Sequence, residues 1–396
     1  MPSAPYQEIN PPQRILLGPG PSNVHPRVQQ AMMAPVLGHM DPYFYTVMED
    51  TMSLLRYLFR TKNALTFPIS ATGSAGMEAG LCNFLEPGDV AVIANNGFFA
   101  DRMINIASRC GAEIIRLDAE WGRIIEPEAI EAALKSQKKV KLLALVHAET
   151  STGVLQPLTE AAQLAKQHEA LFLVDAVTSL GGHEVAVDDW SIDICYSCSQ
   201  KCIGCPPGLS PITVNQKAME TLKKRSHSVS SYYLDLSLLS KYWIRDGSRA
   251  YHHTAPASMF YALHEALVLI ADEGLEARIQ RHAEHGAALQ AGLEAMGLVL
   301  HAQPGHRLST LTTVCIPEGI DDARIRQRLL SDYSMEIGGG LGTLKGKVWR
   351  IGLMGYSSSE QNVLLVLSAL EKLLADEGYK TETGAGIKAA VQSLRK

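Results

Sequence analysis

The sequence has no long apolar run and no cluster of basic residues. Its most apolar windows, 142–146 and 260–271, are too short to span a bilayer or are interrupted by His264 and Glu265, so we expect no membrane span. The net charge is -5 without any run of Lys and Arg, which argues against nucleic acid or an anionic membrane as a partner. Residues 1–14 contain no apolar run after a basic start, so we expect a cytoplasmic protein whose partners are small molecules and further copies of itself.

Disulfide bonds are also not expected, because the chain has seven cysteines, an odd number, and no secretory start. Four of them form two Cys-x-x-Cys pairs, namely Cys195, Cys198, Cys202 and Cys205, a pattern that also suggests a metal-binding or electron-transfer module. Zinc sites of this type need a longer insert between the pairs, and iron–sulfur runs order the gaps differently. On a strand, Cys195 and Cys198 would face opposite sides. We therefore favour small buried thiols and no metal site.

Alternating patterns between residues 70 and 215 predict a large α/β domain. The chain has 396 residues, of which 46% are hydrophobic, enough for two or three domains. Short aliphatic runs alternate here with helical patterns, as in a doubly wound, mostly parallel sheet covered on both faces. The predicted strands are 90–94, 113–117, 141–147, 171–175, 192–197 and 210–214, and the predicted helices are 75–85, 99–109, 127–134 and 159–167.

The pattern changes after residue 274 and predicts a smaller α+β domain. Its predicted elements are a long helix at 275–296, strands at 311–316 and 347–353, and helices at 323–330 and 359–374. The predicted division of the chain is an N-terminal arm at 1–17, a large domain at 18–273, a small domain at 274–376 and a tail at 377–396. We expect this tail to be weakly ordered, with room for one short helix, because it contains glycines and several charges.

Polar residues follow several of the predicted strands, where ligands bind in an open parallel sheet. The segment 70–76, Ser-Ala-Thr-Gly-Ser-Ala-Gly, precedes a helix and could bind phosphate through backbone N–H groups and hydroxyls, although an ordinary helix cap explains it as well. Asp175 ends an apolar strand and is either a turn cap or an ionised partner for a ring nitrogen or a metal. The loop 147–153 suits a ligand-lining role or a plain polar turn.

Two cations are the remaining candidates for chemistry. Lys201 follows the strand 192–197 and is either a solvated loop residue or, inside a cleft, a lysine with the lowered pKa that a Schiff base requires. Arg350 lies within an apolar strand and is either an edge residue or a bidentate clamp for a substrate carboxylate. His252 and His253 have no carboxylate or cysteine at ligand spacing, so we expect a structured loop there.

Taken together, these motifs resemble the class V aminotransferases of fold type I, and within them the alanine–glyoxylate (serine–pyruvate) group. The matching motifs run in family order from residue 16 to about 375. They are Leu17-Gly18-Pro19-Gly20-Pro21-Ser22, Glu149-Thr150-Ser151-Thr152-Gly153-Val154, Val174-Asp175, Ser179-Leu180-Gly181-Gly182, Ser199-Gln200-Lys201, Pro206-Pro207-Gly208, Tyr251-His252-His253-Thr254 and Arg350-Ile351-Gly352.

The resemblance implies a fold type I transferase with a large seven-stranded sheet domain and with pyridoxal 5′-phosphate as cofactor. Lys201 would hold the cofactor as a Schiff base and then move the proton between the substrate Cα and C4′. Asp175 would keep the pyridine nitrogen protonated, and Arg350 would bind the substrate carboxylate. Thr72, Gly73, Ser74 and Gln200 would bind the phosphate, Thr150 the ring hydroxyl, and Phe99 and Val177 would sandwich the ring.

The resemblance also implies a homodimer, in which Tyr251 and Thr254 reach the phosphate of the neighbouring subunit and the N-terminal arm wraps the partner. The implied reaction moves the amino group of L-alanine or L-serine to glyoxylate and gives glycine with pyruvate or hydroxypyruvate. A cysteine desulfurase of the same fold is the alternative. Those enzymes generally have His before the lysine and a cysteine on a mobile loop, whereas Gln200 precedes Lys201 here and 338–346 contains no cysteine.

Overall fold

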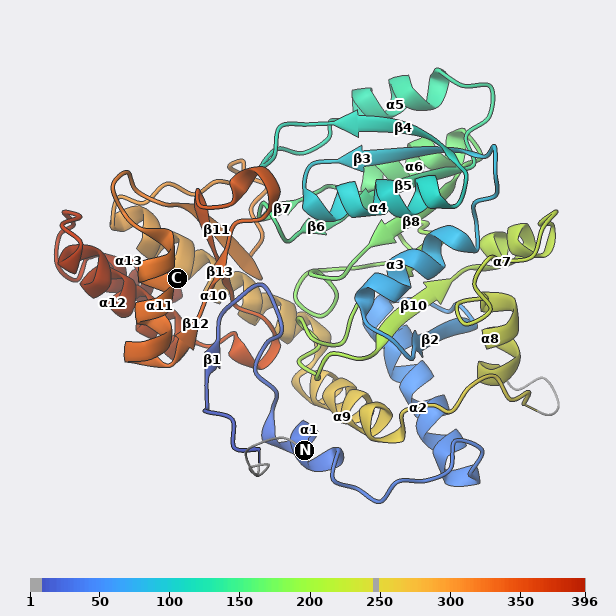
Figure 1. Cartoon of the computed structure of the whole chain (residues 1–396), viewed down its shortest axis with the longest axis horizontal. Coiled ribbons are helices and arrows are strands. Elements are labelled where there is room, and N and C mark those ends of the chain that lie inside the picture. Colours follow the sequence, from blue (N-terminus) through green and yellow to red (C-terminus); the bar gives the residue numbers. More distant parts are fainter. Residues whose placement is uncertain (1–8, 245–248, 396) are drawn as a thin grey trace, which may run out of the picture.

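The computed structural model describes residues 9–244 and 249–395, and its centre is a seven-stranded sheet (Figure 1). Strand β10 runs antiparallel to both of its neighbours, and all other adjacent strands are parallel. The predicted α/β class with a mostly parallel sheet is therefore confirmed. In spatial order the strands are β2 (Leu65–Ile69), β10 (Ser210–Val214), β9 (Ile194–Tyr196), β8 (Leu171–Asp175), β5 (Leu142–Val146), β3 (Val90–Asn95) and β4 (Glu113–Asp118).

The predicted strands of this sheet are all present, and β2 is an addition that the sequence pattern did not indicate. β2 contains Pro68, which has no N–H to donate to a neighbouring strand. β2 lies at the edge of the sheet and pairs only with β10, where Pro68 lies opposite Pro211. A strand with one neighbour needs only half of its backbone groups for pairing, so the proline is tolerated there.

Helices cover the sheet, with α4 in front of it and α6 behind it in Figure 1. Their apolar faces and the strands form one large core, in which Trp243 stacks between Phe67 and Phe260 at centroid distances of 5.2 and 5.4 Å. The helices are α1 (Pro26–Ala31), α2 (Pro42–Phe59), α3 (Gly73–Cys82), α4 (Phe98–Arg109), α5 (Pro127–Lys135), α6 (Thr159–Gln167), α7 (Gln216–Lys223), α8 (Leu236–Trp243) and α9 (Ala257–Glu273).

The C-terminal part has its own hydrophobic core around a small antiparallel sheet, drawn in orange and red in Figure 1. Trp349 and Leu370 are fully buried in this core. Its main elements are α10 (Leu275–Ala295), β11 (Leu311–Cys315), α11 (Asp322–Tyr333), β13 (Gly338–Gly339), β14 (Val348–Gly352) and α12 (Glu360–Asp376). The predicted strands and helices of this part are thus present.

The tail after residue 376 contains the one short helix that was expected there, but this helix packs on the small domain, which corrects the expectation of a weakly ordered tail. The segment contains α13 (Ala385–Leu394), which packs against α10 and α12 and buries Ala390 completely. Contact with α10 is close because small residues face each other: a Cβ on Gly292 would lie 2.9 Å from the carbonyl oxygen of Gly386. Gly384 and Gly386 made the tail look like a loop, since the packing partner of its helix is distant in the chain.

The end of the predicted N-terminal arm packs on its own subunit. β1 (Ile15–Leu16) pairs in parallel with β12 (Met335–Glu336), and Leu17 is buried in the small core. Residues 15–17 are thus bound to the small domain of their own chain, the wrapping of a partner by the arm stays a prediction, and residues 1–8 lie outside the described residues. None of the helices in the described ranges combines the length and hydropathy of a membrane span.

Candidate active site

A cavity of about 240 Å³ opens at the carboxyl ends of the parallel strands and brings together most of the predicted site residues. The exceptions are Tyr251 and Thr254, which are exposed and do not line it. The predicted residues that line it are Thr72, Gly73, Ser74, Phe99, Thr150, Asp175, Val177, Gln200, Lys201 and Arg350, and the additional ones are Pro19, Gly20, Met77, Arg102, Val146, Ala148 and Leu341.

Lys201 is a buried residue, not a solvated loop lysine, with 7% of its surface exposed. Its Nζ donates a hydrogen bond to the carbonyl oxygen of Pro19. Burial lowers the pKa of the Lys201 ammonium, and the charge of Arg350 lowers it further. A lowered pKa increases the fraction of neutral amine, which is the form that attacks a carbonyl group.

Gly20 is required beside this lysine for two reasons. Its φ is +111°, a conformation that side chains other than glycine rarely adopt. In addition, a Cβ at this position would lie 2.8 Å from Cδ and 2.9 Å from Cε of Lys201. The N-terminal segment therefore crosses the lysine closely, and a side chain at position 20 would force the flexible end of Lys201 to shift.

Asp175 ends β8 and is fixed by two donors. Its Oδ2 accepts from the hydroxyl of Tyr196 at 2.6 Å, and its Oδ1 accepts from the backbone N–H of Val177 at 2.8 Å. Burial raises the pKa of Asp175 to about 6, while these two hydrogen bonds oppose the rise. The group is therefore ionised at neutral pH and can pair with a protonated ring nitrogen. Sequence patterns do not single out Tyr196, because only the β8–β9 register places it opposite Asp175.

The loop before α3 presents unused polar groups to the cavity. Thr72 is the N-cap residue, yet its side chain makes no capping hydrogen bond. Its hydroxyl therefore does not serve as an ordinary helix cap. Gly73 lets the loop approach the next strand ends closely, because a Cβ there would lie 2.8 Å from Cβ of Cys198. Oε1 of Gln200 is buried without a hydrogen-bond partner among the described residues. This oxygen is an acceptor and cannot bond to an ionised phosphate, so the NH₂ group of the Gln200 amide is the part that could donate to one. The positive end of α3 and the Thr72 hydroxyl, which makes no capping hydrogen bond, also suit a phosphate group.

Phe99 and Val177 line the cavity, and Phe99 is held there by the capping of its helix. Gly97, the N-cap residue of α4, has no side chain to cap it. Ser151 Oγ instead accepts from Phe98 N–H at 2.9 Å, and Glu149 Oε2 accepts from Ala100 N–H at 3.3 Å. Any side chain at position 97 would collide with Glu149. The loop 147–153 therefore caps a distant helix as well as lining the cavity with Thr150, and this capping role is not visible in the sequence pattern.

Arg350 reaches the cavity from the middle of β14 in the small domain. Nε donates to the carbonyl oxygen of Gly339 at 2.8 Å, and Nη1 donates to that of Thr150 at 3.2 Å. Burial lowers the pKa of Arg350 to about 10, so it stays protonated at neutral pH. The second of these hydrogen bonds joins the two domains across the cavity.

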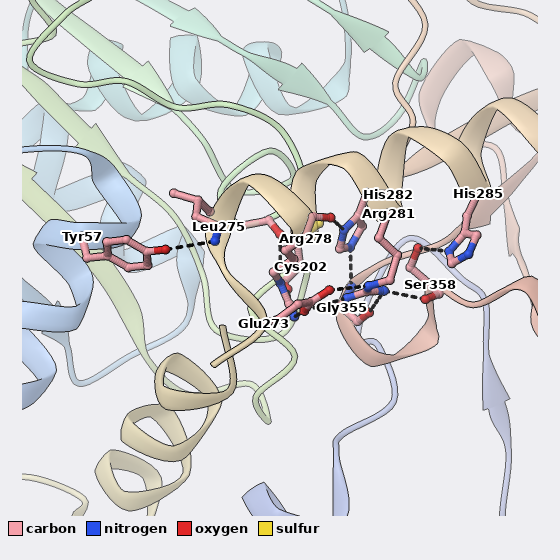
Figure 2. Close-up of polar contacts among 11 residues, drawn as sticks. Tyr57, Cys202, Glu273, Leu275, Arg278, Arg281, His282, His285, Gly355 and Ser358 are labelled. Carbon is pink, nitrogen blue, oxygen red and sulfur yellow. Dashed lines mark hydrogen bonds and ion pairs between the residues drawn. The ribbon is translucent and has the colours of Figure 1, made fainter. Parts of the chain in front are cut away.

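The turn that follows Lys201 is held by Arg278 at the start of α10 (Figure 2). Arg278 is buried and donates to the carbonyl oxygen of Cys202 at 2.6 Å and to that of Gly181 at 3.1 Å. Its Nη1 forms an ion pair with Glu273 at 2.7 Å. The lysine segment is thus bonded directly to the helix that begins the small domain.

His282, one turn further along α10, adds a second link (Figure 2). Its Nε2 accepts from the N–H of Gly355 at 3.0 Å, so its Nδ1 carries the proton and donates to the carbonyl oxygen of Arg278 at 2.7 Å. Burial lowers the pKa of His282 well below 6.5, which keeps the ring neutral. Gly355 in turn lies against the Lys201 turn, because a Cβ on it would be 3.2 Å from the carbonyl oxygen of Lys201.

The cysteines around Lys201 are buried free thiols, as expected. Burial raises the pKa of Cys198 and of Cys202 to about 12, so neither is a thiolate at neutral pH.

The His252–His253 pair lies in a structured loop. The Nδ1 atoms of the two residues lie 2.8 Å apart, and His253 Nε2 contacts Ser70 Oγ at 2.7 Å.

These groups fit pyridoxal 5′-phosphate. A buried amine can take the aldehyde, an ionised carboxylate can pair with the ring nitrogen, and the N-terminus of α3 with the Thr72 hydroxyl and the NH₂ group of Gln200 can hold the phosphate. All of these groups line one cavity at the carboxyl ends of the strands of a fold type I sheet. The fold and the site therefore define a pyridoxal-phosphate enzyme.

Comparison with known proteins assigns the family. The profile of the family "Aminotransferase class-V" matches residues 19–363. The chain is 41% identical to the (S)-ureidoglycine–glyoxylate transaminase of Bacillus subtilis (97% of this chain, 96% of the other) and 38% identical to the alanine–glyoxylate aminotransferase of Drosophila melanogaster (94% and 95%). The crystal structure of the alanine–glyoxylate aminotransferase of Nostoc sp. superimposes with a TM-score of 0.91 at 48% identity, over 94% of this chain and 98% of the other.

The chain thus belongs to the class V aminotransferases, and it is a pyridoxal-phosphate-dependent aminotransferase.

Proposed function

We propose that the enzyme transfers the amino group of L-alanine, or of L-serine, to glyoxylate and gives glycine with pyruvate or hydroxypyruvate. Glyoxylate appears in the names of all three relatives described above. The amino donor differs between them, because the Bacillus subtilis protein is named for (S)-ureidoglycine. The donor must therefore be argued from the cavity.

The apolar wall around Arg350 is the observation that favours a small donor. Arg102 also lines the cavity but bonds to Ser74 of the phosphate loop, so Arg350 is left for the substrate with the apolar or small residues Pro19, Gly20, Met77, Val146, Ala148 and Leu341. The guanidinium suits the α-carboxylate. No further carboxamide or carboxylate stands among the described lining residues, so the N–H groups and carbonyl of a ureido group would lose hydrogen bonds. The methyl group of alanine loses none.

Each site residue then has a defined task. Pyridoxal phosphate, when bound, supplies the aldehyde that takes up the amino group and a ring that withdraws electrons. Lys201 holds the aldehyde carbon and, once released, moves the proton at the substrate α-carbon. Asp175 keeps the ring nitrogen protonated, and Thr150 orients the ring hydroxyl. Thr72, Gly73, Ser74 and Gln200 bind the phosphate, and Phe99 and Val177 hold the ring between them.

A panel of half-reactions tests the donor. The purified holoenzyme is mixed with L-alanine, L-serine or (S)-ureidoglycine, and the change from the pyridoxal to the pyridoxamine absorption band is followed for each. We expect kcat/KM for L-alanine to exceed that for (S)-ureidoglycine by about tenfold or more. A faster reaction with (S)-ureidoglycine would contradict the proposed donor. Lys201→Ala is the control and should convert none of the three.

We also propose that the enzyme is a homodimer in the cytoplasm. Tyr251 is 61% exposed, Tyr232 is 68% exposed, and Tyr233 donates to the carbonyl oxygen of Ser70 beside the phosphate loop. This aromatic surface and the exposed Thr254 suit contact with a second copy and its phosphate site. Light scattering should give twice the chain mass of 43.0 kDa, and Tyr251→Phe together with Thr254→Ala should weaken cofactor binding. A monomer with full cofactor affinity would contradict the proposal.

A further inference from the structure

We propose that Arg102 is the cationic contact for the cofactor phosphate and that it determines how strongly the enzyme prefers phosphorylated to unphosphorylated pyridoxal. The proposal rests on the assignment of the phosphate to Thr72, Gly73, Ser74 and Gln200 made above. Arg102 was not among the candidates from the sequence. It lies on α4, three residues after Phe99, and lines the active-site cavity.

The contacts of Arg102 place its guanidinium at the phosphate end of the cavity. Nη1 donates to Ser74 Oγ at 3.0 Å. The guanidinium carbon lies 5.0 Å from the centre of the Phe99 ring and 5.6 Å from that of Phe98, within range of a cation–π contact. The two rings and the serine thus hold the side chain over the phosphate loop. The capping of α4 by Glu149 and Ser151 fixes the helix from which it extends.

The charge balance of the cavity leaves this task to Arg102. A bound phosphate monoester carries a charge of roughly -1.5 to -2 at neutral pH, whereas Thr72, Gly73, Ser74 and Gln200 are all neutral. The N-terminus of α3 contributes only about half a positive charge. The other charged residues that line the cavity are Asp175, Lys201 and Arg350. Asp175 is anionic, Lys201 is assigned to the aldehyde, and Arg350 bonds to Gly339 and Thr150.

Arg102 is also free to accept an anion. Within residues 9–244 and 249–395, no carboxylate forms an ion pair with it, whereas the nearby Arg116 pairs with Asp101 at 2.9 Å and with Asp118 at 2.6 Å. Its single hydrogen bond to Ser74 leaves other guanidinium N–H groups available. A guanidinium with unused donors beside a phosphate loop is well shaped for two phosphate oxygens.

Comparison of two ligands separates a charge contact from a merely structural role. Wild-type apoenzyme, Arg102→Gln, Arg102→Lys and the control Arg109→Gln, which changes an arginine in the last turn of the same helix, are titrated with pyridoxal 5′-phosphate and with pyridoxal. Binding is followed by quenching of tryptophan fluorescence. For Arg102→Gln we expect the Kd of pyridoxal phosphate to rise by roughly tenfold or more, and the Kd of pyridoxal to stay within about twofold of the wild type, since that ligand offers the guanidinium no anion.

Salt and the second variant complete the test. Added NaCl should raise the Kd of pyridoxal phosphate more steeply for the wild type than for Arg102→Gln, because the variant has lost the screened charge. Arg102→Lys should keep the steep salt dependence, and it serves as the decisive variant if Arg102→Gln does not fold. Equal weakening of both ligands, or an unchanged ratio of the two Kd values, would overturn the proposal. If the wild type itself bound both ligands equally, the phosphate assignment of the loop would be wrong instead.

Discussion

Replacement of Tyr196 by Phe should move the pH range in which the apoenzyme binds pyridoxal phosphate. The change deletes the hydroxyl that donates to Asp175 at 2.6 Å and leaves the buried ring in place. A hydrogen bond to a charged group contributes about 1.5 kcal/mol or more, which corresponds to roughly one pKa unit. The pKa of Asp175, raised to about 6 by burial, should therefore rise to about 7 in the variant.

The sign of the effect follows from the form of Asp175 that is required. Only the carboxylate pairs with a protonated ring nitrogen, so binding weakens as pH falls through the pKa of Asp175. At pH 6 the ionised fraction should drop from about one half in the wild type to about one tenth in Tyr196→Phe, whereas at pH 8 both are almost fully ionised. The Kd of the variant should thus be about fivefold higher than that of the wild type at pH 6 and nearly equal at pH 8.

The assay is fluorescence titration of the apoenzyme from pH 5.5 to 8.5, with the result expressed as the ratio of the two Kd values at each pH. Titration of the ligand itself cancels in this ratio. Tyr242→Phe is a matched control, because Tyr242 is equally buried and its hydroxyl donates to His39, away from the cavity. A ratio that stays constant over the whole pH range would refute the argument, because damage to packing does not depend on the ionisation of Asp175.

Three further variants test other parts of the site. Arg350→Lys should raise KM for the amino acid and the 2-oxo acid together by roughly tenfold to a hundredfold. An unchanged KM in steady-state kinetics would show that Arg350 does not bind the substrate. Gly20→Ala should destabilise the enzyme by about 1–2 kcal/mol in urea unfolding and slow cofactor capture, since its Cβ would lie 2.8 Å from Lys201 Cδ; normal capture would show that the segment moves aside. His282→Gln should lower the free energy of unfolding by about 2 kcal/mol at pH 8. Below about pH 6.5 the unfolded wild-type chain protonates His282 and the folded chain does not, so the wild type loses stability as pH falls. The difference in stability between wild type and variant should therefore shrink at low pH in thermal scans. A constant difference would contradict a neutral buried ring.

The residues found through sequence patterns share one property. Asp175 ends one predicted apolar strand, Lys201 comes shortly after the next one, and the carboxyl ends of parallel strands meet at one edge of a sheet whatever the order of the strands. Their convergence on one cavity could therefore be predicted from local periodicity alone. Arg350 was found in the same way, as a cation inside an apolar strand.

The residues that the patterns missed depend on contacts between distant segments. Tyr196 reaches Asp175 only through the register of β8 with β9, and Glu149 caps α4 only because Gly97 leaves it room. Arg102 looks like an ordinary polar residue of a surface helix until the helix is placed beside Ser74. None of these relations is visible in the spacing of residues along the chain.

The sequence by itself determined the alternation of strands and helices, because hydrophobic periodicity is a local property, and the resemblance of its motifs to a known family implied the class of enzyme and the role of Lys201. The tertiary structure decided the packing of α13 on α10, the edge position of β2 and the groups that surround each predicted side chain. It thereby also decided the charge states of Lys201, Asp175 and Arg350, since burial and neighbouring charges, which shift their pKa values, arise only when segments far apart in the chain come together.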